Sequence, residues 1–344
     1  MPEFDVTPEK RATFRAFFHR QFFVVPPQVT RKDVNIEGKT VIITGSNTGI
    51  GFETAKQILA LGASLLILAV RDEAKGEAAK KTLAAHVDTA TQQLDVWLLD
   101  LSSVDSVTKF VERTSSLERL DIVINNAGLS KTRFTLNEAT KHEETIQVNY
   151  LSCALLTILL LPVLKSKNSP DQPGRIVLVN SDTASWPKFK ERNLTPLLAA
   201  FDNESNFDRG DRYFTSKLLC QLFLSELTKR VPATVAIVNA PNPGLCSTGL
   251  QRDLDGTIAG FIFNIFKKLV ARTADVGART ITDAAVNHGT GSHGQYLEDG
   301  KIQPLAPLVY KPEGLKIAEQ LWKETMEDLK FAKAAEIIDS LKSR

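Results

Sequence analysis

A glycine-rich turn between two apolar runs constrains the fold of this chain more than any other feature. Residues 41–43 favour a buried strand, and residues 45–51 form the turn. Residues 52–61 favour a helix that ends at Gly62, and residues 65–70 favour a second strand. A strand, a helix and a strand in this order make a βαβ unit, whose two strands lie parallel in one sheet. The segment therefore predicts an α/β fold.

The same alternation continues along the chain. Further helices are predicted over residues 74–85, 103–114, 148–164 and 214–230, and further strands over 95–99, 120–124, 175–179 and 234–239. The repetition predicts an α/β doubly wound, mostly parallel sheet of Rossmann type with helices on both faces. We expect one domain over residues 38–312, preceded by an N-terminal arm (1–37) and followed by a C-terminal helical extension (313–344) that packs on it.

Composition and charge exclude several classes of protein. Lys and Arg number 42 against 40 Asp and Glu, a net charge of +2, so no large basic surface for nucleic acid is expected. The widely spaced Cys153, Cys220 and Cys246 make neither a disulfide framework nor a metal site. The longest apolar run, 151–164, contains Pro162 and is shorter than the roughly 20 residues that a bilayer needs, so it predicts a core helix. The acidic N-terminus does not resemble a secretory signal, and a cytoplasmic location is expected.

The turn itself predicts a site for a dinucleotide. It lies between an apolar strand and a helix, where glycines let the backbone approach a pyrophosphate at the helix N-terminus. Its Gly-x-x-x-Gly-x-Gly spacing differs from the commoner dinucleotide fingerprint, and no Lys-Ser/Thr follows as in a P-loop. A turn without a ligand is the alternative, which the flanking βαβ pattern disfavours. The expected cofactor-binding residues are Thr44, Gly45, Ser46, Asn47, Thr48, Gly49, Ile50 and Gly51.

The residue after the second strand favours NADP over NAD. Arg71 stands where an acid would accept a hydrogen bond from the ribose 2′-hydroxyl, whereas a guanidinium pairs with a 2′-phosphate. Lys75 also favours phosphate, while Asp72 would favour NAD if the register shifted by one residue. A solvated charge at the strand end is the remaining interpretation of Arg71.

Seven motifs occur in order along residues 38–250. They are Thr44-Gly45-x-x-x-Gly49-Ile50-Gly51, Asp100-Leu101, Asn125-Asn126-Ala127-Gly128, Asn149, Ser181, Tyr213-x-x-x-Lys217, and Pro243-Gly244 with Thr248. Together they resemble the short-chain dehydrogenase/reductase superfamily. Residues 68–77 and 294–300 look like its retinol-dehydrogenase-like branch, which includes many fungal reductases of secondary metabolism.

The resemblance implies a catalytic set of Asn149, Ser181, Tyr213 and Lys217. Ser181 would hydrogen-bond the substrate carbonyl, Lys217 would bind the nicotinamide ribose, and Asn149 would hold a water of a proton relay. Tyr213 and Lys217 are four apart on a predicted helix, so we expect the ammonium to lower the pKa of the phenol. The resemblance also implies cofactor contacts at Asp100, Leu101, Asn126, Ala127, Gly128, Tyr213, Lys217, Pro243, Gly244 and Thr248.

Two departures from the family pattern concern the catalytic region. Many relatives have a pair of serines at the strand end, and here Asn180 replaces the first of them. Residues 187–212 lengthen the connection to Tyr213, and we expect this loop to shape substrate access.

Two apolar segments lie outside the motifs. Residues 10–23 place Phe14, Phe17, Phe18 and Phe22 on one face of a predicted helix, with basic residues between them. This helix either binds a membrane surface peripherally or, as we prefer, packs on the protein or caps a hydrophobic substrate mouth. Residues 250–275 predict a lid over the substrate, with ordinary core as the alternative.

These observations predict an NADPH-dependent reductase of a ketone or aldehyde on a fairly large apolar substrate, in secondary metabolism. One alternative is a dehydrogenase of a retinol-like alcohol. Another is a cofactor-binding scaffold, a sensor or a rearrangement catalyst without redox chemistry. A hydrolase is disfavoured because the Gly-x-Ser-x-Gly elbow is missing. We expect no metal and no nucleic acid, and a homo-oligomer is compatible with the family.

Overall fold

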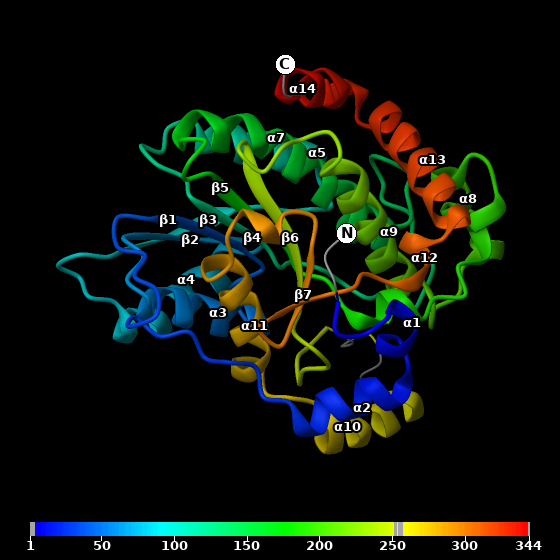
Figure 1. Ribbon diagram of the computed structural model, residues 1–344, viewed down its shortest axis with the longest axis horizontal. Coiled ribbons are helices and arrows are strands. Elements are labelled where there is room, and N and C mark those ends of the chain that lie inside the picture. The colour runs from blue at the N-terminus through cyan, green and yellow to red at the C-terminus, as the bar shows by residue number, and fades with distance from the viewer. Residues whose placement is uncertain (1–3, 251–252, 254–256, 343–344) are drawn as a thin grey trace.

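A computed structural model describes residues 4–250, 253 and 257–342. Its centre is an eight-stranded sheet in the order β3-β2-β1-β4-β5-β6-β7-β8, in which only β8 runs antiparallel (Figure 1). The strands are β1 Thr40–Thr44, β2 Leu65–Val70, β3 Gln93–Leu98, β4 Ile122–Asn125, β5 Gly174–Leu178, β6 Ala236–Asn242, β7 Tyr296–Glu298 and β8 Lys301–Gln303. The predicted Rossmann-type sheet is confirmed, with strand bounds shifted by a few residues.

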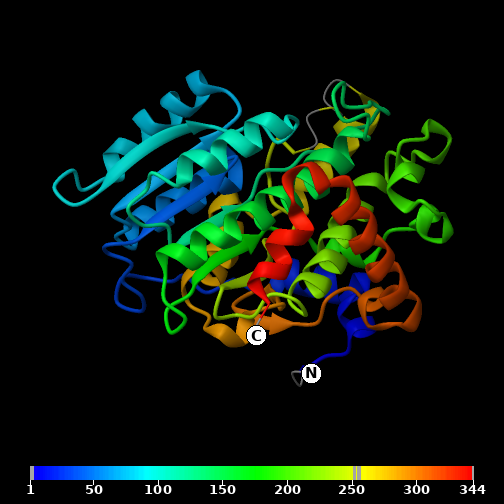
Figure 2. The same cartoon turned by 90° about the horizontal axis from the view of Figure 1, so that it is seen from above.

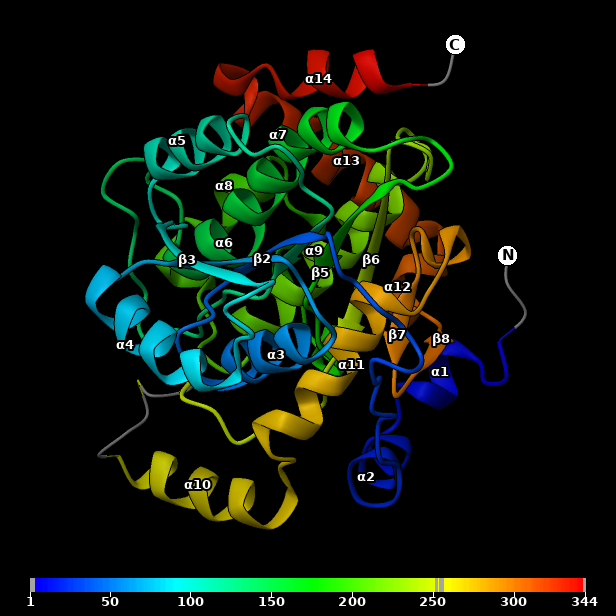
Figure 3. The same cartoon turned by 90° about the vertical axis from the view of Figure 1, so that its left-hand side faces the viewer.

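Helices cover both faces of the sheet (Figure 3). One face carries α3 (Gly49–Ala60), α4 (Glu73–Leu83) and α11 (Ala274–Val286), and the other carries α5 (Val104–Thr114), α7 (Ser152–Lys167) and α9 (Arg212–Leu227). Successive side chains of a strand point to opposite faces, so Ile42 enters one apolar cluster while Val41 and Ile43 enter the other. Val41 pairs with Leu66 of β2 and Ile122 of β4, which aligns the carboxyl ends of these central strands.

The longest apolar helix belongs to the core. By length and composition Glu144–Lys167 could cross a membrane, but 78% of its apolar window is buried within the protein. The sequence predicted a plain helix over 148–164. The structure instead has α6 (Glu144–Ile146), a π-helical turn (Gln147–Leu151) and then α7.

The predicted N-terminal helix over residues 10–23 is divided in two. α1 (Pro8–Arg11) ends before Thr13, whose backbone is extended and whose Oγ1 accepts a hydrogen bond from the Ala16 amide at 3.2 Å. This cap begins α2 (Phe14–Phe23), which lies at the same end of the molecule as α10 (Ile258–Val270) (Figure 1).

The C-terminal part adds a hairpin and further helices. β7 and β8 are joined by Asp299 and Gly300, both in the left-handed region, and this Asp-Gly turn was overlooked in the sequence. α12 (Pro307–Tyr310) and α13 (Pro312–Asp328) follow, with α13 packed on α9. α14 (Ala334–Leu341) packs on α7 (Figure 2). The short helix α8 (Leu197–Phe201) lies in the long loop before α9.

Candidate active site

A cavity of about 720 Å³ lies at the carboxyl ends of the central strands, where doubly wound sheets bind their ligands. Its wall combines the glycine-rich turn, the ends of β2, β4 and β5, the start of α9, the loop after β6, and parts of α2 and α10. All predicted cofactor-binding residues line it except Ser46. The Ser46 side chain is buried and donates to the Ile43 carbonyl at 2.9 Å, so it stabilises the turn from behind.

The turn is fixed closely against the end of β4. Thr44 Oγ1 accepts hydrogen bonds from the amides of Asn126 (3.0 Å) and Ala127 (2.9 Å). The Asn126 Nδ2 donates to the Thr44 carbonyl at 2.9 Å and to the Gly45 carbonyl at 3.2 Å. A Cβ at Gly51 would lie 2.5 Å from the Asn126 Nδ2, so only glycine fits there.

This cradle fits a pyrophosphate. Gly45 has φ +65°, and a Cβ there would come within 3.0 Å of Ala127. Thr48 is the N-cap residue of α3, but its side chain accepts no hydrogen bond from the first backbone N–H groups of the helix. Both features let phosphate oxygens approach backbone N–H groups.

Arg71 and Asp72 differ in what they already contact. Arg71 is exposed and lines the cavity, and no hydrogen bond or ion pair engages it within the described part of the chain. The Asp72 carboxylate caps α4, accepting from the Lys75 amide at 3.1 Å, and it pairs with the Lys75 Nζ at 3.2 Å. These hydrogen bonds from Lys75 lower the pKa of Asp72.

Ser181, Tyr213 and Lys217 meet at the other part of the cavity. Tyr213 and Lys217 lie on one face of α9, with the Lys217 Nζ 5.7 Å from the Tyr213 ring centroid. The ammonium donates to the Val179 carbonyl at 2.9 Å, next to the end of β5. Ser181 Oγ accepts from the Thr183 hydroxyl at 2.9 Å, which leaves its own proton available to a ligand.

The net pKa shift of Tyr213 is upward, although the Lys217 ammonium lowers the pKa as expected. Burial raises it above its usual value, and this outweighs the Lys217 ammonium and the Ser181 hydroxyl, which lower it. The charge of buried Asp182 raises it further. In the protein alone, Tyr213 is therefore a protonated phenol at neutral pH.

Asn149 lies behind the cavity wall rather than in it. It belongs to the π-helical turn, and its amide exchanges two 2.8 Å hydrogen bonds with the backbone of Leu129 and donates to Ser216 Oγ at 3.0 Å. A Cβ at Gly128 would lie 3.2 Å from Asn149 Oδ1 and 3.9 Å from the Lys217 Nζ. Gly128 thus keeps open the space between these two side chains.

Comparisons with known proteins decide the family. The chain is 49% identical over 343 residues to the short-chain dehydrogenase fogG of Aspergillus ruber, covering 98% of both chains. It is 45% identical over 327 residues to the short chain dehydrogenase/reductase mfmJ of Annulohypoxylon moriforme, covering 94% of both. The family profile described as short chain dehydrogenase matches residues 39–191. The chain belongs to the short-chain dehydrogenase/reductase superfamily.

Solved structures of this superfamily share the fold. An uncharacterised protein of Mycobacterium paratuberculosis is 28% identical, with a TM-score of 0.63 over 88% of this chain and 98% of that one. An NADPH-bound short chain oxidoreductase of Pseudomonas aeruginosa is 21% identical, with a TM-score of 0.58 over 77% of this chain and 96% of that one. The chain thus belongs to a family of oxidoreductases.

Asn180, which departs from the serine pair of many short-chain dehydrogenases, joins β5 to α9. Its Nδ2 donates to the Lys217 carbonyl at 3.1 Å, and its Oδ1 accepts from the Ser181 amide at 2.8 Å and from the Gln221 Nε2 at 2.9 Å. A serine is too short to make all three contacts. The departure therefore ties Ser181 to the helix that carries Lys217.

Several lining residues escaped sequence reasoning. Trp186 lines the cavity from the loop after Ser181, and Phe214 lines it next to Tyr213. A lone aromatic residue in a loop gives no periodic signal, so nothing in the sequence marked Trp186. Of the predicted lid over 250–275, residues 251–252 and 254–256 lie outside the described residues. Phe263 and Phe266 of α10 line the cavity, and the segment of α11 from Ala274 onward packs on the sheet instead.

Proposed function

We propose that this chain is an NADPH-dependent reductase that adds hydride to the carbonyl carbon of a ketone or aldehyde. The observation that carries the proposal is the position of Ser181, Tyr213 and Lys217 in the same cavity as the glycine-rich turn. Membership in the superfamily supports the oxidoreductase class. Similarity to fungal short-chain dehydrogenases supports a role in secondary metabolism.

The catalytic side chains divide the reaction between them. NADPH supplies the hydride when it is bound. Ser181 donates a hydrogen bond to the substrate carbonyl oxygen and fixes its position. Tyr213 gives its hydroxyl proton to that oxygen, and the Lys217 ammonium stabilises the phenolate that remains until solvent reprotonates it. One hydride and one proton thus convert the carbonyl to an alcohol.

The choice of NADPH rests on Arg71. Its guanidinium lines the cavity at the end of β2 without a protein partner among the described residues, whereas the neighbouring Asp72 is engaged by α4 and Lys75. A forked, charge-assisted contact with a 2′-phosphate would satisfy Arg71.

Oxidation of an alcohol is the second candidate, because the same groups catalyse both directions. Burial raises the pKa of Tyr213 and so keeps it in the protonated form that donates a proton in reduction. A scaffold without redox chemistry would have no use for the assembled serine, tyrosine and lysine.

The first test is a pair of fluorescence titrations of the full chain with NADPH and NADH. We expect NADPH to bind at least about tenfold more tightly, as a charge-assisted contact predicts. NADPH consumption in the presence of a panel of apolar ketones and aldehydes then tests the reaction. Failure to bind either cofactor would refute the proposed function.

A further inference from the structure

Four aromatic side chains from three separate segments form one side of the cavity. We call Phe14, Phe17, Trp186 and Phe214 the aromatic wall, and all four line the cavity. Phe14 stacks on Trp186 with ring centroids 4.9 Å apart and an interplanar angle of 26°. Phe17 and Phe214 meet the Trp186 ring edge-on, at 5.4 Å and 6.4 Å.

The aromatic wall adjoins the catalytic tyrosine. The Phe214 ring lies 6.3 Å from the Tyr213 ring, at an angle of 69°. A substrate whose carbonyl oxygen lies at Tyr213 and Ser181 would therefore have rings of the wall within reach. Phe14 remains 64% exposed in the structure, so much of its ring is free for such a contact.

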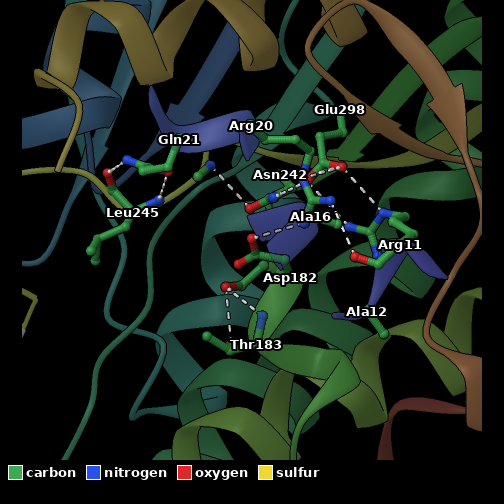
Figure 4. Close-up of polar contacts among 12 residues, drawn as sticks. Arg11, Ala12, Ala16, Arg20, Gln21, Asp182, Thr183, Asn242, Leu245 and Glu298 are labelled. Carbon is green, nitrogen blue, oxygen red and sulfur yellow. Dashed lines mark hydrogen bonds and ion pairs between the residues drawn. The ribbon is translucent and has the colours of Figure 1, made fainter. Parts of the chain in front are cut away.

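Buried ion pairs fix the arm that supplies half of the wall (Figure 4). Arg11 and Glu298 make two hydrogen bonds of 3.2 Å although their side chains are only 1% and 3% exposed. Arg20 of α2 pairs with Glu298 at 3.0 Å and with Asp182, next to the catalytic serine, at 3.6 Å. The Trp186 Nε1 donates to the Ala12 carbonyl at 2.6 Å. Breaking a buried ion pair is costly, so these contacts hold α2 in one place.

Gln21 joins the arm to the loop after β6 and to α10. Its Nε2 donates to the carbonyls of Leu245 (2.7 Å) and Val270 (3.0 Å), and its Oε1 accepts from the Leu245 amide at 3.2 Å (Figure 4). Leu245 follows the Pro243-Gly244 loop, and Val270 ends α10. The helix that carries Phe14 and Phe17 is thus anchored to both sides of the catalytic centre.

We propose that the N-terminal arm is a fixed part of the substrate site and that its aromatic wall selects a flat, conjugated carbonyl compound. An aromatic substrate gains stacking or edge contacts with these rings in addition to apolar burial, whereas a saturated one gains burial alone. The family profile begins at residue 39, so the two rings that the arm contributes, Phe14 and Phe17, lie outside it. The inference rests on the proposed carbonyl reduction and adds the substrate class.

Two aldehydes with the same carbon skeleton test the inference: 2-naphthaldehyde and its saturated counterpart, decahydronaphthalene-2-carbaldehyde. The alcohol formed with NADPH is quantified by chromatography, and the ratio of the two kcat/KM values is compared between variants. The two aldehydes differ in intrinsic reactivity, but this difference is the same for every variant and therefore cancels when the ratios are compared. The ratio is kcat/KM for 2-naphthaldehyde divided by kcat/KM for the saturated aldehyde. We expect Phe14→Leu to lower this ratio about fivefold, because one aromatic contact with the substrate is lost.

Two controls separate this role from a general structural one. Phe14→Tyr restores the ring and is expected to keep the ratio within about twofold of the wild type. Phe23→Leu changes the same residue type on the same helix at a side chain that is 77% exposed and does not line the cavity, and it is expected to change nothing. An unchanged ratio in Phe14→Leu, or equal changes in Phe14→Leu and Phe23→Leu, would overturn the aromatic wall as a selector.

A binding measurement distinguishes failure of the inference from failure of the proposed function. If neither aldehyde is reduced, both are titrated by calorimetry into the protein saturated with NADP⁺. Tighter binding of naphthaldehyde that is lost in Phe14→Leu would support the aromatic wall and refute the reduction of such aldehydes. Equal binding of the two aldehydes, or binding of neither, would refute the aromatic wall.

Discussion

Tyr213 shows how a single residue can be tested independently of the fold. Replacing it with phenylalanine removes only the hydroxyl that transfers the proton, and the ring that packs beside Phe214 remains. We expect Tyr213→Phe to lower kcat by about 10²–10⁴-fold, the usual contribution of general acid catalysis. NADPH binding, measured by fluorescence, should stay within about twofold of the wild type. Equal losses of binding and turnover would contradict the role.

Arg71 is the corresponding test of cofactor choice. Because no acid among the described residues pairs with its guanidinium, Arg71→Ala leaves no buried charge unpaired and should act on the cofactor alone. We expect it to weaken NADPH binding by roughly 1.5–3 kcal/mol, the range for a hydrogen bond to a charged group, and to leave NADH binding nearly unchanged. Paired titrations of both cofactors measure this discrimination. If the preference for NADPH survives, the 2′-phosphate is recognised elsewhere.

At the scale of elements, Asp182, which pairs with Arg20 of α2, should make the stability of the protein depend on pH. Burial and the neighbouring Glu298 raise the pKa of this carboxyl to about 6 from an ordinary value of 3.8. The folded protein therefore binds a proton more tightly than the unfolded chain. The stabilisation that this tighter proton binding at Asp182 provides is complete below pH 3.8 and is lost as the pH rises through 6.

Asp182→Asn removes this titration and keeps the shape of the side chain. At each pH, the free energy of unfolding of the wild type is subtracted from that of Asp182→Asn. From a shift of this size we expect this difference to be more positive at pH 7.5 than at pH 4 by roughly 2 kcal/mol. Denaturant unfolding at both pH values measures this change. A pH-independent difference between the two proteins would show that Asp182 does not titrate in this way.

The same elements show what sequence reasoning can and cannot reach. The βαβ unit around the glycine-rich turn was predictable because its apolar runs, its turn and its helix are neighbours in the chain. The division of the N-terminal helix depends on the Thr13 cap, and its location depends on Arg11 pairing with Glu298, 287 positions away. Local patterns carry no information about such a pairing.

Motifs predicted that Ser181, Tyr213 and Lys217 share one site, and they do line one cavity, but the motifs carried no information about the energetics of these residues. The spacing of Tyr213 and Lys217 correctly placed both on one helix face, but residue spacing carries no measure of burial. Burial is what raises the pKa of the tyrosine against the influence of the lysine. Asn180 was noticed as a departure, and its three hydrogen bonds became visible only when β5 and α9 were seen side by side.

At the scale of the whole molecule, the arm and the domain should unfold together. Arg11 and Arg20 bind Glu298 of β7, and Gln21 binds the loop after β6, so the arm cannot detach without breaking buried contacts of the sheet. Trypsin cleavage after Arg15, which is exposed but lies in the first turn of α2, requires that turn to open. Its rate therefore reports the free energy of opening.

We expect cleavage at Arg15 to be much slower in the native protein than in the unfolded chain, as followed by mass spectrometry during limited trypsin digestion. Arg20→Met removes the ion pairs that Arg20 makes with Glu298 and Asp182. Because a broken buried ion pair costs several kcal/mol, the substitution should speed cleavage at Arg15 by at least about tenfold. Cleavage after Lys141, which is exposed and lies outside the helices and strands, serves as the internal control because Arg20 does not contact it. Rapid loss of the first 15 residues from an otherwise intact wild-type protein would show that the arm is an independent appendage.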